Sequence, residues 1–305
     1  MSKKKLIALI VATSSVILMA LCVGLNLQLL KDRLAGRDYT PSAEIAEITE
    51  TLRLTQRGEA IFYATHPQLQ SKTTFNENCG RDGSAVNYTL GCYKNDDSER
   101  IYIYNPEIKE IDENGIRYSL KTDRDVTVLH EILHAAYERL SKNEQADICE
   151  DLRDVEQSTA KLSSELELYD EAHYCTEAFA RVGSEYLNFA QSDTIDRLTP
   201  IYGRYFEVNE ELMNSYWQNV VQADKLMETI SNSNSTLNTA QNNLHAEIDN
   251  YYRNSTSEKY SSVNSQIAQY NDMVATHNSL VATARKIRDG LDSERTDTIE
   301  SYLKR

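Results

Sequence analysis

Two histidines one helical turn apart are the residues of this chain best suited to chemistry. His130 and His134 bound the pentapeptide His-Glu-Ile-Leu-His, which lies inside an apolar run with helical spacing. Residues four positions apart share one face of a helix, so both imidazoles can reach a single Zn²⁺ ion. Glu131, beside the first histidine, could then take a proton from a water molecule at that ion. The pattern predicts a zinc site, against the alternative of a chance match among six histidines.

A catalytic zinc site needs a third protein ligand and one open position for water. Metzincin peptidases extend the motif with a glycine and a third histidine, but Tyr137 and Leu140 occupy those positions here, which excludes that class. We predict that Glu177, on a separate amphipathic helix, is the third ligand. His173, one turn earlier, is the alternative. The competing interpretation of Glu177 is an ordinary surface glutamate in a chain with 47 acidic residues.

The remaining catalytic roles follow from what peptide hydrolysis requires. Glu131 is the predicted general base, which accepts a proton during attack and returns it to the leaving amine. Stabilisation of the oxyanion needs a side-chain donor besides zinc, and Tyr169 and His173 are our candidates, with Tyr174 as a further possibility. Glu185 could orient one zinc histidine through its second ring nitrogen.

These segments resemble the zincin-type metallopeptidases of the gluzincin branch, and the wider plan is similar to that of a group of bacterial membrane-anchored proteins. The resemblance covers roughly residues 55–215 and departs from thermolysin-like members, because no Asn-Glu-x-x-Ser-Asp segment is present. It implies a zinc-dependent endopeptidase and a strand, Ile101 to Tyr104, that binds peptide substrate as an added strand. The segments that carry it are Phe62-Tyr-Ala64, Asn76 to Cys79, Gly91-Cys-Tyr93, Ile101 to Tyr104, the zinc helix and Thr176-Glu-Ala-Phe-Ala180.

The N-terminus has the pattern of a membrane anchor. A short basic segment, residues 1–5, precedes residues 6–30, which carry no charge and are long enough to span a bilayer. We predict a single-pass protein of the cell membrane, with residues 1–5 in the cytoplasm and the rest outside. A signal peptide cleaved near Ala20 is the alternative, and a lipoprotein site at Cys22 fits less well because Leu21 is bulky.

Four cysteines follow Cys22, an even number that suits an oxidising compartment. We predict the disulfides Cys79–Cys92 and Cys149–Cys175, although the sequence alone does not choose among the three possible pairings. A second metal cluster is the competing interpretation, but no Cys-x-x-Cys spacing supports it.

The fold class that we predict is α+β. A linker over residues 31–57, with a helix from Pro41 to Leu54, precedes a zincin-like catalytic domain over 58–207. Residues 58–121 are expected to hold the small β-sheet, including strands Tyr88 to Tyr93 and Arg100 to Tyr104. Helical periodicity follows from about Asp123, and Thr199 to Gly203 is expected to interrupt it.

Residues 208–305 are predicted to form an antiparallel coiled-coil helical hairpin. Apolar residues recur in steps of three and four on both sides of a polar break at Arg253 to Glu258. Asn234, Gln241 and His277 fall at core positions, and polar core residues either fix the register or mark a surface for a protein partner. A plain stalk is the alternative. We expect Ile230 and Val274 to lie roughly opposite each other.

The charge balance narrows the class of partner. The net charge of −15 makes binding to nucleic acid improbable. We therefore predict a membrane-anchored, extracytoplasmic zinc endopeptidase that acts on a peptide or protein substrate and contacts the lipid bilayer through its N-terminal helix. The alternative is a non-catalytic surface or adhesion protein in which the hairpin carries the interaction.

Overall fold

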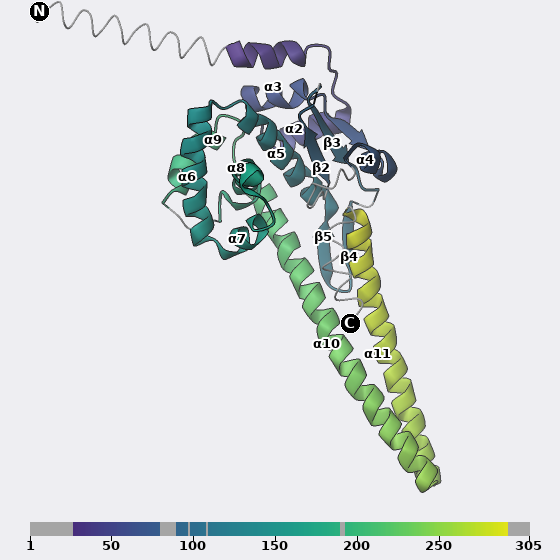
Figure 1. The fold of residues 1–305 in the computed structure, drawn as a ribbon. Coiled ribbons are helices and arrows are strands. Elements are labelled where there is room, and N and C mark those ends of the chain that lie inside the picture. Colours follow the sequence, from purple (N-terminus) through teal and green to yellow (C-terminus); the bar gives the residue numbers. More distant parts are fainter. Residues whose placement is uncertain (1–26, 80–89, 97, 108, 190–192, 292–305) are drawn as a thin grey trace, which may run out of the picture. The chain divides into compact units, whose positions relative to one another are not determined.

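The computed structural model describes residues 27–79, 90–96, 98–107, 109–189 and 193–291, which are mostly helical with two small sheets (Figure 1). These residues fall into two compact units. The first unit takes in residues up to 79, 91–103 and 125–212, and the second takes in residue 90, 104–124 and residues from 213 onward.

Most of the predicted membrane span, residues 6–26, lies outside the described part of the chain, as does the basic segment 1–5. Residues 27–35 are helical where the description begins. Among the described residues, no helix is both long enough and apolar enough to cross a membrane.

Two short helices open the first unit. The predicted helix from Pro41 to Leu54 is present as α2, Ala43–Thr51, with Ser42 as its N-cap. The apolar run after Gly58 is helical and belongs to α3, Gln56–Ala64. Both helices bury their aliphatic and aromatic residues, which explains their amphipathic spacing.

The sheet of the first unit has three strands in the order β1-β3-β2. The two expected strands are found as β2, Gly91–Lys94, and β3, Arg100–Tyr104, which pair antiparallel. Strand β1, Gln68–Gln70, and helix α4, Lys72–Cys79, were not foreseen. Because β3 is paired on both sides, it has no free edge for a peptide. The expectation that Ile101 to Tyr104 binds substrate as an added strand is therefore wrong.

The helices that follow the sheet carry the predicted chemistry. Ser141 and Glu144 form a capping box at the start of α6. Pro200 lies inside α9, which ends at Tyr202 with Gly203 as its C-cap, so the interruption expected at Thr199 to Gly203 falls at the end of that segment. The bounds are α5 Leu120–Glu138, α6 Lys142–Ser158, α7 Ala160–Leu166, α8 Glu171–Arg181, a π-helix η1 Val182–Tyr186, and α9 Ile195–Tyr202.

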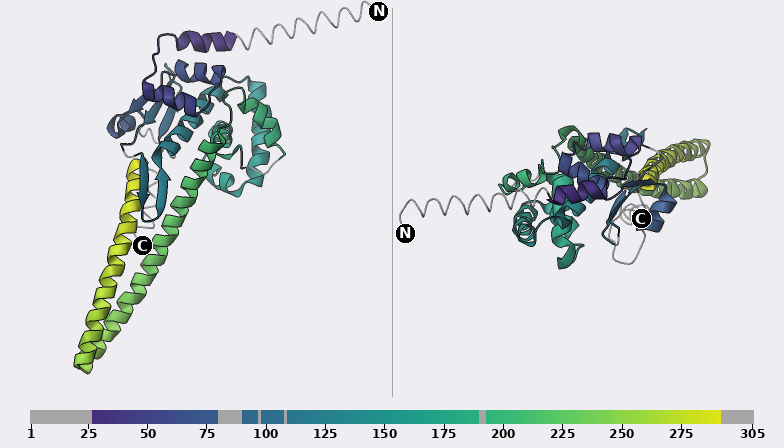
Figure 2. Two further views of the ribbon diagram at one scale, coloured as in Figure 1. Left: turned by 180° about the vertical axis from the view of Figure 1, so that it is seen from behind. Right: turned by 90° about the horizontal axis from the view of Figure 1, so that it is seen from above.

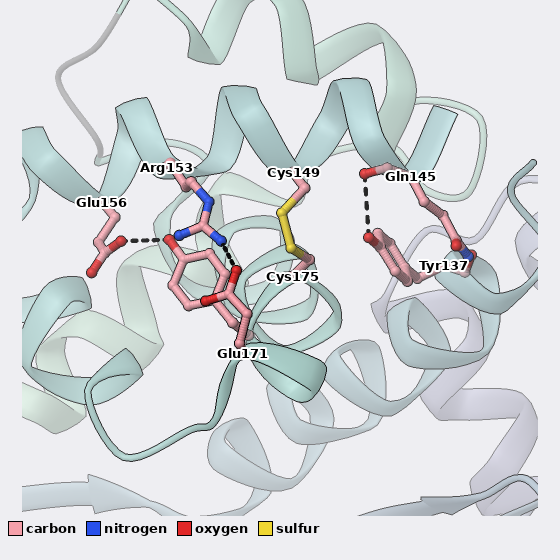
Figure 3. The surroundings of a disulfide bond; sticks show 8 residues. Tyr137, Gln145, Cys149, Arg153, Glu156, Glu171 and Cys175 are labelled. Atoms are coloured by element: carbon pink, nitrogen blue, oxygen red, sulfur yellow. Dashed lines mark hydrogen bonds and ion pairs between the residues drawn. A yellow bond between two sulfur atoms is a disulfide. The ribbon is translucent and has the colours of Figure 1, made fainter. Parts of the chain in front are cut away.

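Both predicted disulfides are present. Cys79 pairs with Cys92, with their Cα atoms 6.0 Å apart, and Cys149 pairs with Cys175, with their Cα atoms 5.3 Å apart. The second bond joins α6 to α8, as Figure 3 shows. Beside it, Arg153 forms an ion pair with Glu171 and stacks over the ring of Tyr174, 4.4 Å from its centroid.

The second unit combines a β-hairpin with two long helices. Strands β4, Glu110–Glu113, and β5, Ile116–Ser119, join through Asn114 and Gly115, whose positive φ angles of 54° and 72° suit a tight hairpin turn. Asn114 Nδ2 donates to Thr283 Oγ1 of the last helix at 2.8 Å. The β-hairpin therefore packs against that helix.

The predicted helical hairpin is present. Helix α10, Glu210–Arg253, and helix α11, Ser257–Gly290, run side by side in opposite directions (Figures 1 and 2). His277 Nδ1 lies 3.2 Å from Ser233 Oγ, and this contact fixes the register. Counting three residues from it in each direction places Ile230 opposite Leu280. The expected pairing of Ile230 with Val274 is therefore wrong by more than one helical turn.

The register predicts which engineered cysteines will crosslink. Ser233→Cys combined with His277→Cys should form a disulfide within one chain under mild oxidation, because these side chains already touch. Cysteines at Ile230 and Val274 should react much more slowly. Electrophoresis without reductant and mass analysis of the crosslinked peptides would measure both. Crosslinks found only between chains would replace the hairpin with an oligomeric coil.

Candidate metal centre

Helix α5 positions the two histidines. Its buried face includes Leu129, Ile132 and Leu133, all at most 1% exposed, and burial of this stripe fixes the rotation of the helix. His130 and His134 then lie on one side, with their side chains 13% and 17% exposed. Their Nε2 atoms are 3.0 Å apart.

Helix α8 brings the predicted third ligand to the same point. The helix begins at Asp170, whose carboxylate accepts the backbone N–H of His173. Two turns later, Glu177 is buried, with Oε1 3.6 Å from His130 Nε2 and Oε2 3.4 Å from His134 Nε2. The three residues thus form a group that could hold a metal ion.

The spacing of the donor atoms fits a tetrahedral ion. Ligands bound to zinc at ~2.0–2.1 Å stand about 3.3 Å from one another. The two separations within one candidate donor set, 3.0 Å between the Nε2 atoms and 3.4 Å from His134 Nε2 to Glu177 Oε2, lie close to that value. Two neutral imidazoles and one carboxylate are also a ligand set that zinc favours, so the residues fit the ion.

The charge of the surroundings favours a cation as well. Glu131, Glu177 and Glu185 are each at most 7% exposed. Arg181 contributes one positive charge to this group through contacts with Glu177 and Glu185. Buried carboxylates are costly unless paired, so the surplus of negative charge would be relieved by a divalent cation.

Both histidines have a partner for the ring nitrogen that faces away from the group. His134 Nδ1 is 3.1 Å from Thr176 Oγ1, and His130 Nδ1 is 3.8 Å from Glu185 Oε1. When Nδ1 of His134 donates to Thr176, Nε2 is left as the metal-binding lone pair and the ring is held in that orientation. Glu185 is beyond hydrogen-bond distance of His130 and can favour the same tautomer there only through its charge. Glu185 therefore lies where the sequence predicted an orienting carboxylate, whereas Thr176 was not foreseen.

Glu131 is buried against the edge strand β2. The backbone N–H of Tyr93 donates to Glu131 Oε2 at 2.8 Å. A Cβ atom at Gly91 would approach Glu131 Cγ to 2.9 Å, so the absence of a side chain there lets the strand lie this close. Burial, and to a smaller extent the charge of Glu177, raise the pKa of Glu131 to about 7. A bound cation would oppose this rise.

The two other predicted catalytic residues differ in their placement. Burial and the charge of Glu177 raise the pKa of Tyr169, which also interacts with Arg181. Tyr169 is thus adjacent to the metal group. The ring of His173 is instead 67% exposed, and its Nδ1 atom lies 2.6 Å from Asp170 Oδ1 at the start of α8. His173 is not part of the group that could hold a metal.

The sequence analysis did not identify Arg181, which lies among the buried carboxylates. Arg181 is 8% exposed and lies four residues from both Glu177 and Glu185, on the same side of the helix. The spacing of opposite charges in steps of four was a readable signal for this. The π-helix beyond it was not readable, and there a Cβ atom at Gly183 would meet Leu133 Cδ1 at 2.6 Å. Close packing of η1 on α5 therefore depends on that glycine.

Comparison of the chain with family models, curated proteins and solved structures finds no match.

Proposed function

We propose that the protein is a zinc endopeptidase of the gluzincin type, anchored in the cell membrane by its N-terminal segment, with the catalytic residues outside the cytoplasm. The observation that carries the proposal is the convergence of His130, His134 and Glu177, with Glu131 buried beside them. The two disulfides favour an oxidising compartment and so support the outside location.

His130, His134 and Glu177 would hold the ion. When bound, Zn²⁺ supplies Lewis acidity, which lowers the pKa of a water molecule and polarises the scissile carbonyl. Glu177 is suited to charged ligation, because Arg181 Nε donates to its Oε1 atom at 2.8 Å and so favours the ionised carboxylate. Thr176 would keep the His134 imidazole aimed at the ion, and the charge of Glu185 would favour a proton on Nδ1 of His130.

Glu131 would move the proton. Its Oε2 atom is occupied by the N–H of Tyr93, which fixes the carboxylate and leaves Oε1 as the proton acceptor. Oε1 would accept a proton from the attacking water and pass it to the nitrogen of the leaving amine. Tyr169 is the better placed of the predicted oxyanion donors, because its raised pKa keeps the hydroxyl protonated beside the metal group.

The edge strand β2 would bind the peptide substrate, in place of the central strand β3. The N–H of Tyr104 donates to the carbonyl of Leu90 at 2.9 Å. Hydrogen-bonded pairs alternate along an antiparallel ladder, so the backbone groups of Gly91 and Tyr93 face away from β3. The N–H of Tyr93 reaches Glu131 on that outer side, where the described part of the chain has no paired strand. An extended peptide could pair with Gly91 there.

The test is metal content measured together with proteolysis. Purified full-length protein in detergent should carry about one zinc ion per chain and cleave members of an unbiased peptide library. A chelator should abolish cleavage, and added Zn²⁺ should restore it. Absence of bound metal and of zinc binding would contradict the proposal. Bound zinc with no cleavage of any peptide would favour the non-catalytic surface protein instead.

A further inference from the structure

Arg181 contacts three carboxylates near the metal group through its single planar guanidinium. Its Nε atom donates to Glu177 Oε1 at 2.8 Å. Its Nη1 atom donates to Glu165 Oε2 at 3.2 Å and lies 3.5 Å from Glu185 Oε1. The guanidinium therefore joins the proposed ligand, the carboxylate that faces His130, and a third acidic residue.

We propose that Arg181 is a positioning residue that determines which carboxylate oxygen of Glu177 faces the metal ion. Because Arg181 holds Oε1, Glu177 is left with Oε2, the atom 3.4 Å from His134 Nε2, as its free ligand atom. The carboxylate is thereby restricted to one oxygen and one rotamer. The inference rests on the proposed metal site and adds the residue that determines its ligand geometry.

The same guanidinium links Glu177, the proposed ligand, to Glu185, the carboxylate that faces the His130 ring. Glu185 belongs to the π-helix η1, and it faces both Arg181 and His130 Nδ1. Arg181 thus couples the direction of the Glu177 carboxylate to the carboxylate that faces the His130 ring. A lysine would keep the charge but could not reproduce this planar arrangement of donors.

The position of Arg181 is itself fixed by Glu165, which also contacts Tyr186. Glu165 Oε2 accepts from Arg181 Nη1 and also from the hydroxyl of Tyr186 at 2.9 Å. The side chain of Arg181 is 10% exposed, so the guanidinium has little freedom to swing into solvent. A side chain used only as a surface ion pair would show neither this burial nor three carboxylate partners.

A purely structural ion pair is the competing explanation, and Arg139 provides a matched control for it. Arg139 is also a buried arginine with two carboxylate partners, Asp32 at 2.8 Å and Glu99 at 2.7 Å. Arg139 directly follows the C-terminal end of α5, and it contacts none of the three proposed ligands. Arg139→Lys and Arg181→Lys therefore make the same chemical change, and only the second touches Glu177.

The experiment measures zinc affinity by competition with a chromophoric chelator, and coordination by the visible absorption of the Co²⁺-substituted protein. Arg181→Lys should weaken zinc binding by roughly 10–100-fold and alter the Co²⁺ spectrum, because a freed Glu177 can bind through both oxygens. Arg139→Lys should leave affinity and spectrum as in the wild type. Circular dichroism of the metal-free proteins checks that both variants are folded.

Two results would overturn the inference: wild-type affinity and spectrum in Arg181→Lys, or an equal loss in both lysine variants. If Arg181→Lys does not fold, Glu165→Gln replaces it, because it loosens the guanidinium without touching a ligand. About tenfold weaker binding in Glu165→Gln would support the role, and unchanged binding would refute it. Failure of the wild type to bind zinc at all would instead refute the proposed function.

Discussion

Glu131→Gln should lower peptide hydrolysis by roughly 10²–10⁴-fold while leaving the bound zinc in place. Glutamine has nearly the same volume and can still accept the N–H of Tyr93, so the packing between α5 and β2 should survive. It cannot accept a proton from water at neutral pH, so only the proposed proton transfer is lost. The measurements are zinc per chain and cleavage rate of the best library peptide.

Two further variants of α5 distinguish the loss of the proposed base from the loss of a proposed metal ligand. His130→Ala should lose both zinc and activity, because it removes one of three donors. Glu138→Gln is the matched control: it neutralises an exposed glutamate on the same helix and should change neither quantity. Equal cleavage by the wild type and Glu131→Gln would end the assignment of Glu131 as the base.

Removal of the disulfide between α6 and α8 should produce the largest loss of stability. The bond spans 26 residues, and closing a loop of that size stabilises a folded chain by about 3.5 kcal/mol. Cys149→Ala with Cys175→Ala should lower the free energy of unfolding by about that amount, measured by urea denaturation at 25 °C. Cys175 directly precedes Thr176 and Glu177, so zinc affinity should fall as well.

The disulfide Cys79–Cys92 is the control for the expected fall in zinc affinity. Cys79→Ala with Cys92→Ala opens a link that spans 13 residues and should cost about 3 kcal/mol. No proposed ligand lies on α4 or β2, so zinc affinity should change little in that variant. Similar losses of zinc affinity in the two double variants would show that α8 is not held in place by Cys149–Cys175 in particular.

Local patterns predicted the parts of the site that lie on one helix. The four-residue spacing of His130 and His134 needs only helical geometry, so burial of the apolar stripe was enough to place them. The long helices of the hairpin were found for the same reason. Their register was not, because three- and four-residue steps fit several alignments, and the contact between Ser233 and His277 selects one of them.

The sequence by itself determined the residue types of the metal group, the helix that carries both histidines and the helical hairpin, since each is encoded by spacing or composition. The even number of cysteines predicted disulfides, and the tertiary structure selected their pairing. The tertiary structure decided which strand borders Glu131, because strand order depends on long-range pairing and β3 lies between β1 and β2. It also decided the surroundings of Arg181. Opposite charges four residues apart show only that side chains can meet, whereas the tertiary structure buries Arg181 among Glu165, Glu177 and Glu185.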